Sequence, residues 1–227
     1  MVLRYGGMLL LVVAPVTWAT SLQFAPTRLE FDEKTRVKEL RITNRGTEAV
    51  LLELEAFRWN QPEGASALEA TPALLASPPL LEVASGEHAS IRLGFTDTPT
   101  APCELTYRVW VTEVSRQSAV STPIRLRYRV SLPVFRRITA DCTEALTWTR
   151  LDSPPRLRVQ NNGGAHAQIQ EARRTFLGQV VDLEFPEVGY VLPGQYLDIP
   201  LSADATAGDI ELRTRRRIWR GDLHGGQ

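Results

Sequence analysis

Residues 123–135, PIRLRYRVSLPVF, alternate between apolar and polar side chains with a period of two. Successive side chains of a β-strand point to opposite faces, so the segment predicts a strand with an apolar ridge and a charged ridge. The apolar ridge consists of Ile124, Leu126, Tyr128, Val130 and Leu132, and the charged ridge of Arg125, Arg127 and Arg129. Such a strand is either a half-buried sheet member, which is the commoner case, or an edge whose apolar face is kept for a partner.

The rest of the chain also reads as short strands separated by turn residues such as Asn44-Arg45-Gly46 and Pro193-Gly194. In the first half we expect strands at 22–24, 29–31, 40–42, 50–59, 80–83, 89–95, 105–114 and 124–135. In the second half we expect them at 146–149, 156–160, 167–174, 179–181, 188–192, 196–201 and 210–217. With no convincing helical period, this spacing predicts an all-β protein of two β-sandwiches that meet near residues 138–143.

The N-terminus has the layout of a secretory signal peptide. Arg4 precedes an apolar run over 8–13, which small residues follow up to Ala19. The run is much shorter than the roughly 20 residues that a membrane-spanning helix needs. We therefore expect cleavage after Ala19, export, and no membrane insertion.

The charge balance argues against one class of partner. The chain has 26 Lys and Arg residues and 26 Asp and Glu residues, so its formal net charge is +0. Nucleic-acid binding demands a basic surface. A protein partner is the more natural expectation.

Cys103 and Cys142 are the two cysteines of the chain. In an oxidising compartment a disulfide between them is favoured, and two free buried thiols are the alternative. They flank two expected strands that would form an antiparallel hairpin, with a bulge or a frayed end absorbing a mismatch in their positions. A metal site is disfavoured, because two cysteines and three scattered histidines form no ligand cluster.

The sequence shows no catalytic motif. His88, His166 and His224 each stand alone, and Glu53 and Glu55 are explained by an exposed strand face. We therefore expect no catalytic residues and no enzyme activity.

A basic segment near the C-terminus has two interpretations. It contains Arg213, Arg215, Arg216, Arg217 and Arg220. The simpler interpretation is the solvated face of a strand, and the alternative is contact with a partner or a membrane surface.

Several motifs, in this order, resemble the periplasmic chaperones of chaperone-usher pilus assembly. They are Pro26 to Phe31, Leu40 to Asn44, Ser77-Pro78-Pro79 with Gly86 and Ile91 to Leu93, Tyr107 to Val114, Leu157 to Gly163 through His166, and Leu192-Pro193-Gly194. Phe57-x-Trp59 with Gln61, the phrase Ser131 to Phe135 and the cysteine pair resemble the archaic, spore-coat-U-like branch of that family.

The resemblance implies two immunoglobulin-like domains in an L-shaped arrangement, over residues 20–140 and 143–227. It implies a periplasmic chaperone that donates a strand to pilus or coat subunits and delivers them to an outer-membrane usher, without cofactor or ATP. The donated side chains would be Ile124, Leu126, Tyr128 and Val130, with Val120 extending the series. Backbone pairing and side-chain pockets would then supply affinity and register.

The family also anchors the subunit's C-terminal carboxylate on two basic residues between the domains. Arg28 matches the first of them, but Pro133 stands where the better-studied branch has a lysine. Arg92, Arg136 and Arg137 are candidates for the second residue, and Arg136 and Arg137 could instead be solvated residues at the domain junction. The rival interpretation is a secreted immunoglobulin-like structural or adhesion module, in which Ile124, Leu126 and Tyr128 are buried in its own core. An enzyme built on a β-sandwich is a more distant third.

Overall fold

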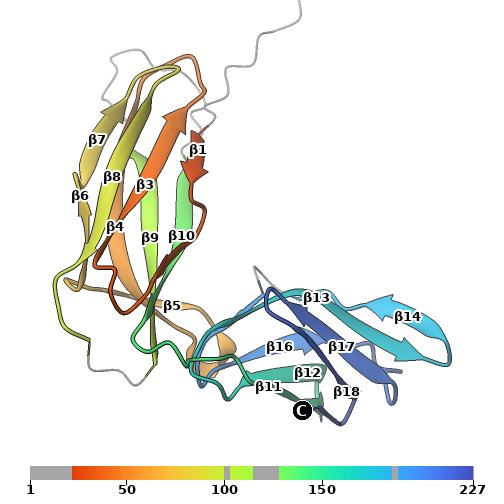
Figure 1. The fold of residues 1–227 in the computed structure, drawn as a ribbon. Coiled ribbons are helices and arrows are strands. Elements are labelled where there is room, and N and C mark those ends of the chain that lie inside the picture. Colours follow the sequence, from red (N-terminus) through yellow and green to blue (C-terminus); the bar gives the residue numbers. More distant parts are fainter. Residues whose placement is uncertain (1–21, 100–102, 115–127, 186–188, 227) are drawn as a thin grey trace, which may run out of the picture.

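The computed structural model describes residues 22–99, 103–114, 128–185 and 189–226. Two β-sandwiches are set at an angle to each other, so the molecule has the shape of an L (Figure 1). Apart from strands, the described residues form only the single 3-10 turn η1 (Pro62–Gly64). None of the described segments is a helix that could cross a bilayer. The expected all-β fold with two immunoglobulin-like sandwiches is confirmed.

The first sandwich consists of two sheets that enclose one core. One sheet has the order β1 (Leu22–Ala25), β3 (Val37–Asn44), β8 (His88–Phe95), β6 (Leu74–Ser77). The other has the order β2 (Leu29–Phe31), β10 (Arg129–Arg137), β9 (Glu104–Val114), β4 (Val50–Asn60), β5 (Ala67–Ala70), and β7 (Leu80–Val83) also pairs with β4. The chain changes sheets between β1 and β2, at Pro26. Alternate side chains from both sheets, among them Leu40, Leu52 and Val109, fill the core.

The second sandwich is formed by one continuous 9-stranded sheet that folds around its own core. Its order is β14 (Gln179–Asp182), β13 (Ala167–Phe176), β17 (Asp209–Thr214), β18 (Ile218–Asp222), β19 (Gly225–Gly226), β11 (Leu146–Asp152), β12 (Pro155–Asn161), β16 (Tyr196–Pro200), while β15 (Tyr190–Val191) pairs with β13. The expected strand 210–217 is wrong at its end. β17 stops at Thr214, and the next three arginines form the turn into β18.

Each domain has a buried asparagine at the end of a strand, Asn44 at the end of β3 and Asn161 at the end of β12. In the first domain, Asn44 Nδ2 donates to the carbonyls of Glu48 and Val83, and its Oδ1 accepts from the Gly46 amide. In the second domain, Asn161 makes the equivalent bonds to Ala165, Val191 and Gly163. Each side chain pairs with backbone groups of the turn that follows it and of a neighbouring strand. The sequence motifs Asn-Arg-Gly and Asn-Asn-Gly therefore mark the same structural position twice.

The junction between the domains is packed and hydrogen-bonded. Trp59 and Phe135 of the first domain form a buried cluster with Tyr190 and Leu192 of the second. The Gln61 side chain donates to the Tyr190 carbonyl at 2.9 Å and accepts from the Leu192 amide at 2.8 Å. Since Gln61 is buried, these bonds satisfy backbone groups that water does not reach. The contacts hold the two sandwiches in one relative orientation.

A disulfide joins Cys103 and Cys142, as expected, with their Cα atoms 5.6 Å apart. It ties the start of β9 to the segment that connects the two domains. The β9–β10 ladder runs without a register shift to the pair Arg137 and Glu104, and the Ile138 amide donates to the Cys103 carbonyl. Cys142 lies further from the end of the ladder than Cys103 does. The turn at 138–141, rather than a bulge, brings the two cysteines together.

Candidate functional site

One edge of β10 is only partly covered. Along its whole length β10 pairs with β9, from Arg129 opposite Thr112 to Arg137 opposite Glu104. On the other edge, β2 pairs in parallel with residues Val134 to Arg136 only. No described strand pairs with that edge between Arg129 and Pro133. Unpaired backbone groups on a strand edge are a template for pairing with another chain.

The apolar ridge of this strand passes from the domain core to the surface. Val134 and Leu132 are buried in the core, Val130 is partly buried against it, and Tyr128 is 36% exposed. The even-numbered face of β10 therefore leaves the core toward the N-terminal end of the strand. Ile124 and Leu126, like Val120, lie outside the described residues, and their role as donated side chains stays a prediction.

The opposite face of β10 is polar and cationic. The Arg129 guanidinium lies over the Trp110 ring at 4.6 Å, and the Arg108 guanidinium over the Trp59 ring at 3.8 Å. Stacking on aromatic rings keeps these charges close to the sheet while they remain partly solvated. Charged side chains beside an open edge discourage pairing with a second copy of the same strand.

The free edge has a defined end. β2 occupies the same side of β10 from Leu29 onward, with Leu29 opposite Val134. A strand added to the free edge therefore meets the start of β2 and must stop beside Arg28. If the added strand runs parallel to β10, as β2 does, the group that reaches Arg28 is its C-terminal end.

Arg28 lines a cleft between the two domains, with a volume of about 200 Å³. The cleft is lined by Arg28, Glu30, Arg137, Glu144, His166, Gln168, Arg215 and Arg216. Arg28 forms an ion pair with Glu30 at 2.5 Å and donates to Gln168 of the second domain at 3.2 Å. Nε of Arg137 is buried and has no hydrogen-bond partner among the described residues. Among the described residues Arg137 has no ion-pair partner, so the cleft contains an unpaired cation beside Arg28.

The positions of the other two anchor candidates correct the sequence-based expectation. Arg136 points to the opposite face of β10 from Arg137, because neighbouring residues of a strand alternate. Its guanidinium binds Asp97 at 2.5 Å, lies 4.2 Å from the Phe95 ring and is nearly buried. Arg92 is exposed on β8, in the other sheet, and does not line the cleft. Arg137 is the expected candidate that the structure brings together with Arg28.

Tyr190 is a buried residue close to several arginines, two of which, Arg28 and Arg215, line the cleft. Burial raises the pKa of its phenol above the ordinary value, because a buried phenolate would lose its hydration. The positive charges of Arg28, Arg108 and Arg215 oppose this effect only in part. Sequence patterns gave no signal for Tyr190, because β15 and β2 lie far apart in the chain.

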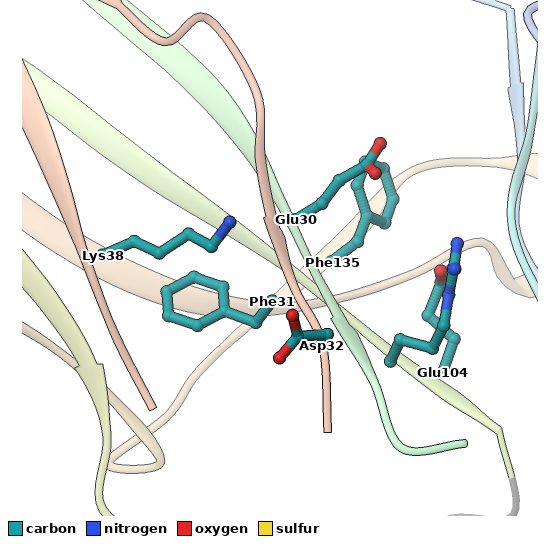
Figure 2. Close-up of a pocket in the computed structure, with 7 residues that line it drawn as sticks. Glu30, Phe31, Asp32, Lys38, Glu104 and Phe135 are labelled. Atoms are coloured by element: carbon teal, nitrogen blue, oxygen red, sulfur yellow. The ribbon is translucent and has the colours of Figure 1, made fainter. Parts of the chain in front are cut away.

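A neighbouring cavity of about 240 Å³ differs in charge. Figure 2 shows Glu30, Asp32 and Glu104 around it, with Lys38 beside the Phe31 ring. Glu104 is committed to the second domain, since its Oε1 accepts from the His166 backbone amide and lies 2.8 Å from Nδ1 of the His166 ring. Because carboxylates predominate here, this cavity is poorly suited to an anionic group.

Two immunoglobulin-like domains, a free strand edge and a cationic cleft at the end of that edge define a class of strand-binding proteins. A family model, pili and flagellar-assembly chaperone, PapD N-terminal domain, matches residues 21–138. The chain belongs to this family. Comparison with curated protein sequences gives no match.

Solved structures of chaperones share the fold over nearly the whole chain. One is the CsuC–CsuE chaperone-tip adhesion subunit pre-assembly complex from archaic Csu pili of Acinetobacter baumannii, with a TM-score of 0.69 and 17% identity over 89% of this chain and 97% of that chain. Another is the Salmonella enterica SafA pilin in complex with the SafB chaperone, with a TM-score of 0.66 and 17% identity over 88% and 91%. A third is the Pseudomonas aeruginosa CupB2 chaperone, with a TM-score of 0.64 and 17% identity over 89% and 99%. At these identities the likeness establishes the fold.

Proposed function

We propose that this protein is a periplasmic chaperone that completes the fold of pilus, fimbrial or coat subunits by donating β10 and then delivers them to an outer-membrane usher. The observation that carries the proposal is the free edge of β10, which ends at Arg28 in a cationic cleft. Family membership and the solved chaperone–subunit complexes with the same fold support it. We further propose that the protein belongs to the archaic branch and is not an enzyme.

Export and domain organisation are part of the same proposal. Residues 1–19 would be a signal peptide cleaved after Ala19, which lies outside the described residues. Residues 20–140 would form the strand-donating domain and residues 143–227 the second domain. The position of the disulfide between them agrees with an oxidising compartment.

The binding energy would come from two sources. Backbone groups between Arg129 and Pro133 would pair with a subunit strand, which gives affinity without regard to sequence. Tyr128 and the predicted ridge residues Ile124 and Leu126 would fill pockets in the subunit. Each large apolar side chain that becomes fully buried contributes roughly 1.5–3 kcal/mol before ordering costs are subtracted.

The subunit's C-terminal carboxylate would bind Arg28 and Arg137. A guanidinium offers two parallel donors to a carboxylate, and a charge-assisted pair in a partly buried cleft is stronger than one on the surface. Arg137 replaces the expected Arg92 and Arg136 in this role. Its place in the cleft beside Arg28 supports the assignment.

Co-expression with a subunit encoded in the same operon, followed by co-purification, tests the proposal. We expect the wild type to form a one-to-one complex and the variant Leu126→Arg/Tyr128→Arg to lose it while remaining folded by circular dichroism. Leu177→Arg/Val180→Arg is a matched control, because it places the same charges on exposed apolar residues far from β10. A complex that survives in the β10 variant would refute strand donation. A variant that unfolds would show that the ridge is core and would favour the structural-module interpretation.

The anchor is tested separately in the same assay. Arg28→Ala and Arg137→Ala should each weaken the complex about tenfold or more, as expected for loss of a charge-assisted bond. Arg92→Ala, which removes an exposed arginine outside the cleft, should have no effect. Equal effects of all three variants would show that net charge, rather than the cleft, controls binding.

A further inference from the structure

The turn between β17 and β18 places two more arginines in the interdomain cleft. Arg215 and Arg216 line it from the second domain, opposite Arg28 and Arg137 of the first. The sequence pattern favours a solvated strand face for this basic segment. The structure ends the strand at Thr214, and Arg215 and Arg216 are exposed residues of the following turn.

The turn has a fixed conformation. Oγ1 of Thr214 accepts from the backbone amides of Arg216 at 3.2 Å and Arg217 at 3.1 Å. The same hydroxyl donates a hydrogen bond to Oε1 of the buried Glu144 at 2.5 Å, and the Thr214 amide donates to the Arg217 carbonyl. The backbone that carries Arg215 and Arg216 is therefore ordered before any ligand arrives, so less entropy is lost on binding.

The charges of the cleft are unbalanced. Of its two carboxylates, Glu30 is paired with Arg28, and Glu144 is buried and hydrogen-bonded to Thr214. Among the described residues, neither Arg215 nor Arg216 has an ion-pair or hydrogen-bond partner for its guanidinium. Like charges that converge on a partly enclosed cleft raise its potential and favour anions.

We propose that Arg215 and Arg216 form a second anionic subsite in the cleft, which recognises an acidic side chain close to the client's C-terminus. The inference rests on the proposed function, because it takes the carboxylate of the client's chain end as the ligand of Arg28 and Arg137. One carboxylate would leave the arginines of the second domain without a counter-ion. A second acidic group, on the face of the added strand that looks toward the second domain, would neutralise them. Clients with an acidic residue near their C-terminus are the substrate class that this cleft selects.

Four synthetic peptides test the subsite. The parent is an acetylated hexapeptide of alternating valine and threonine that ends in Asp-Val with a free carboxylate, and the second peptide ends in Asn-Val. Both are also made as C-terminal amides. Binding is measured by NMR titration at low salt with the wild type, with Arg215→Gln/Arg216→Gln, and with Arg28→Ala.

We expect the wild type to bind the Asp peptide roughly tenfold more tightly than the Asn peptide, a preference that shrinks as salt is added. Arg215→Gln/Arg216→Gln should abolish this preference while still preferring free carboxylates to amides. Arg28→Ala should keep the preference for the Asp peptide over the Asn peptide but lose the preference for free carboxylates over amides. Arg92→Ala should behave as the wild type.

The outcomes separate the two proposals. Equal binding of the Asp and Asn peptides to the wild type, or a preference that persists in the double variant, would overturn the second subsite alone. Equal binding of the peptides with a free carboxylate and the C-terminal amides would overturn the proposed anchor at Arg28 and Arg137. No measurable binding of any peptide would overturn both the anchor and the second subsite.

Discussion

Glu104 and His166 connect the two domains through a buried contact, with Oε1 of Glu104 2.8 Å from Nδ1 of His166. The same oxygen accepts from the His166 backbone amide, and the imidazole stacks on Phe135 with ring centroids 3.4 Å apart. Both side chains are almost fully inaccessible to water. A lone histidine in the sequence thus serves the domain junction.

A double-mutant cycle should measure the strength of this contact. Glu104→Ala and His166→Ala should each destabilise the protein, and their coupling energy should be about 1–3 kcal/mol, because each single variant leaves a buried polar group without its partner. Urea denaturation measures the free energy of unfolding of each variant. The cycle of Glu104→Ala with His88→Ala, an exposed histidine on β8, should be additive within about 0.5 kcal/mol. Additivity in the first cycle as well would contradict the contact.

Removal of the disulfide should lower the free energy of unfolding by about 4 kcal/mol. Cys103 and Cys142 are separated by 39 residues, and the chain-entropy model gives this value for a loop of that length. Urea denaturation of Cys103→Ala/Cys142→Ala tests the expectation. A reducing agent should destabilise the wild type by a similar amount and leave the variant unchanged. A wild type that is insensitive to reduction would show that the cross-link does not restrict the unfolded chain.

The stability of the protein should fall at alkaline pH in part because of Tyr190. Its pKa is raised in the folded state, so the unfolded chain releases this proton first as the pH passes about 10. The stabilising contribution of Tyr190 to the free energy of unfolding is complete below that pH. It is lost as the pH rises through the pKa of Tyr190 in the folded state. Urea denaturation between about pH 8 and 11 should show a shallower loss for Tyr190→Phe than for the wild type. Identical pH profiles would contradict a raised pKa.

A substitution in the turn of the β13–β14 hairpin should stabilise the protein. Leu177 has φ 49 and is 85% exposed, and Gly178 follows with φ 77. A left-handed conformation costs an ordinary residue roughly 1–2 kcal/mol, whereas Asn-Gly is the favoured pair for this kind of two-residue turn. Leu177→Asn should therefore raise the free energy of unfolding by about 1 kcal/mol.

Leu177→Ala provides the control for that change, because it removes the same apolar exposure but keeps the backbone strain. Thermal denaturation should rank Asn above both Ala and Leu at this position. Equal stabilities of the Asn and Ala variants would show that strain in the turn is negligible.

Most strands could be predicted because their signals are local. Short runs between turn residues predict β4, β8 and β9, and the two Asn-x-Gly motifs mark equivalent turns in both domains. The short strands β5, β6, β18 and β19 were missed, because so few residues carry no recognisable period. Their pairing partners, rather than their own sequences, determine them.

The sequence predicts only part of the candidate site. Even-numbered residues of β10 face the core, and this rule extended to the end of the strand places Arg136 inward and Arg137 outward. The alternation therefore contained the signal that distinguishes the two arginines. By contrast, Arg215 and Arg216 reach the cleft through the packing of one domain against the other, which no local pattern encodes.

The start of β2 at Leu29 limits where a strand bound to β10 can end. A strand that bound the free edge of β10 would have to stop at Arg28, because β2 occupies the edge from Leu29 onward. A client with one residue added or removed before its carboxylate would have to present its opposite face to the ridge or abandon the anchor. The start of β2 would thus fix the register of a bound client, so the proposed chaperone would select clients by the spacing between their carboxylate and the side chains that contact the ridge.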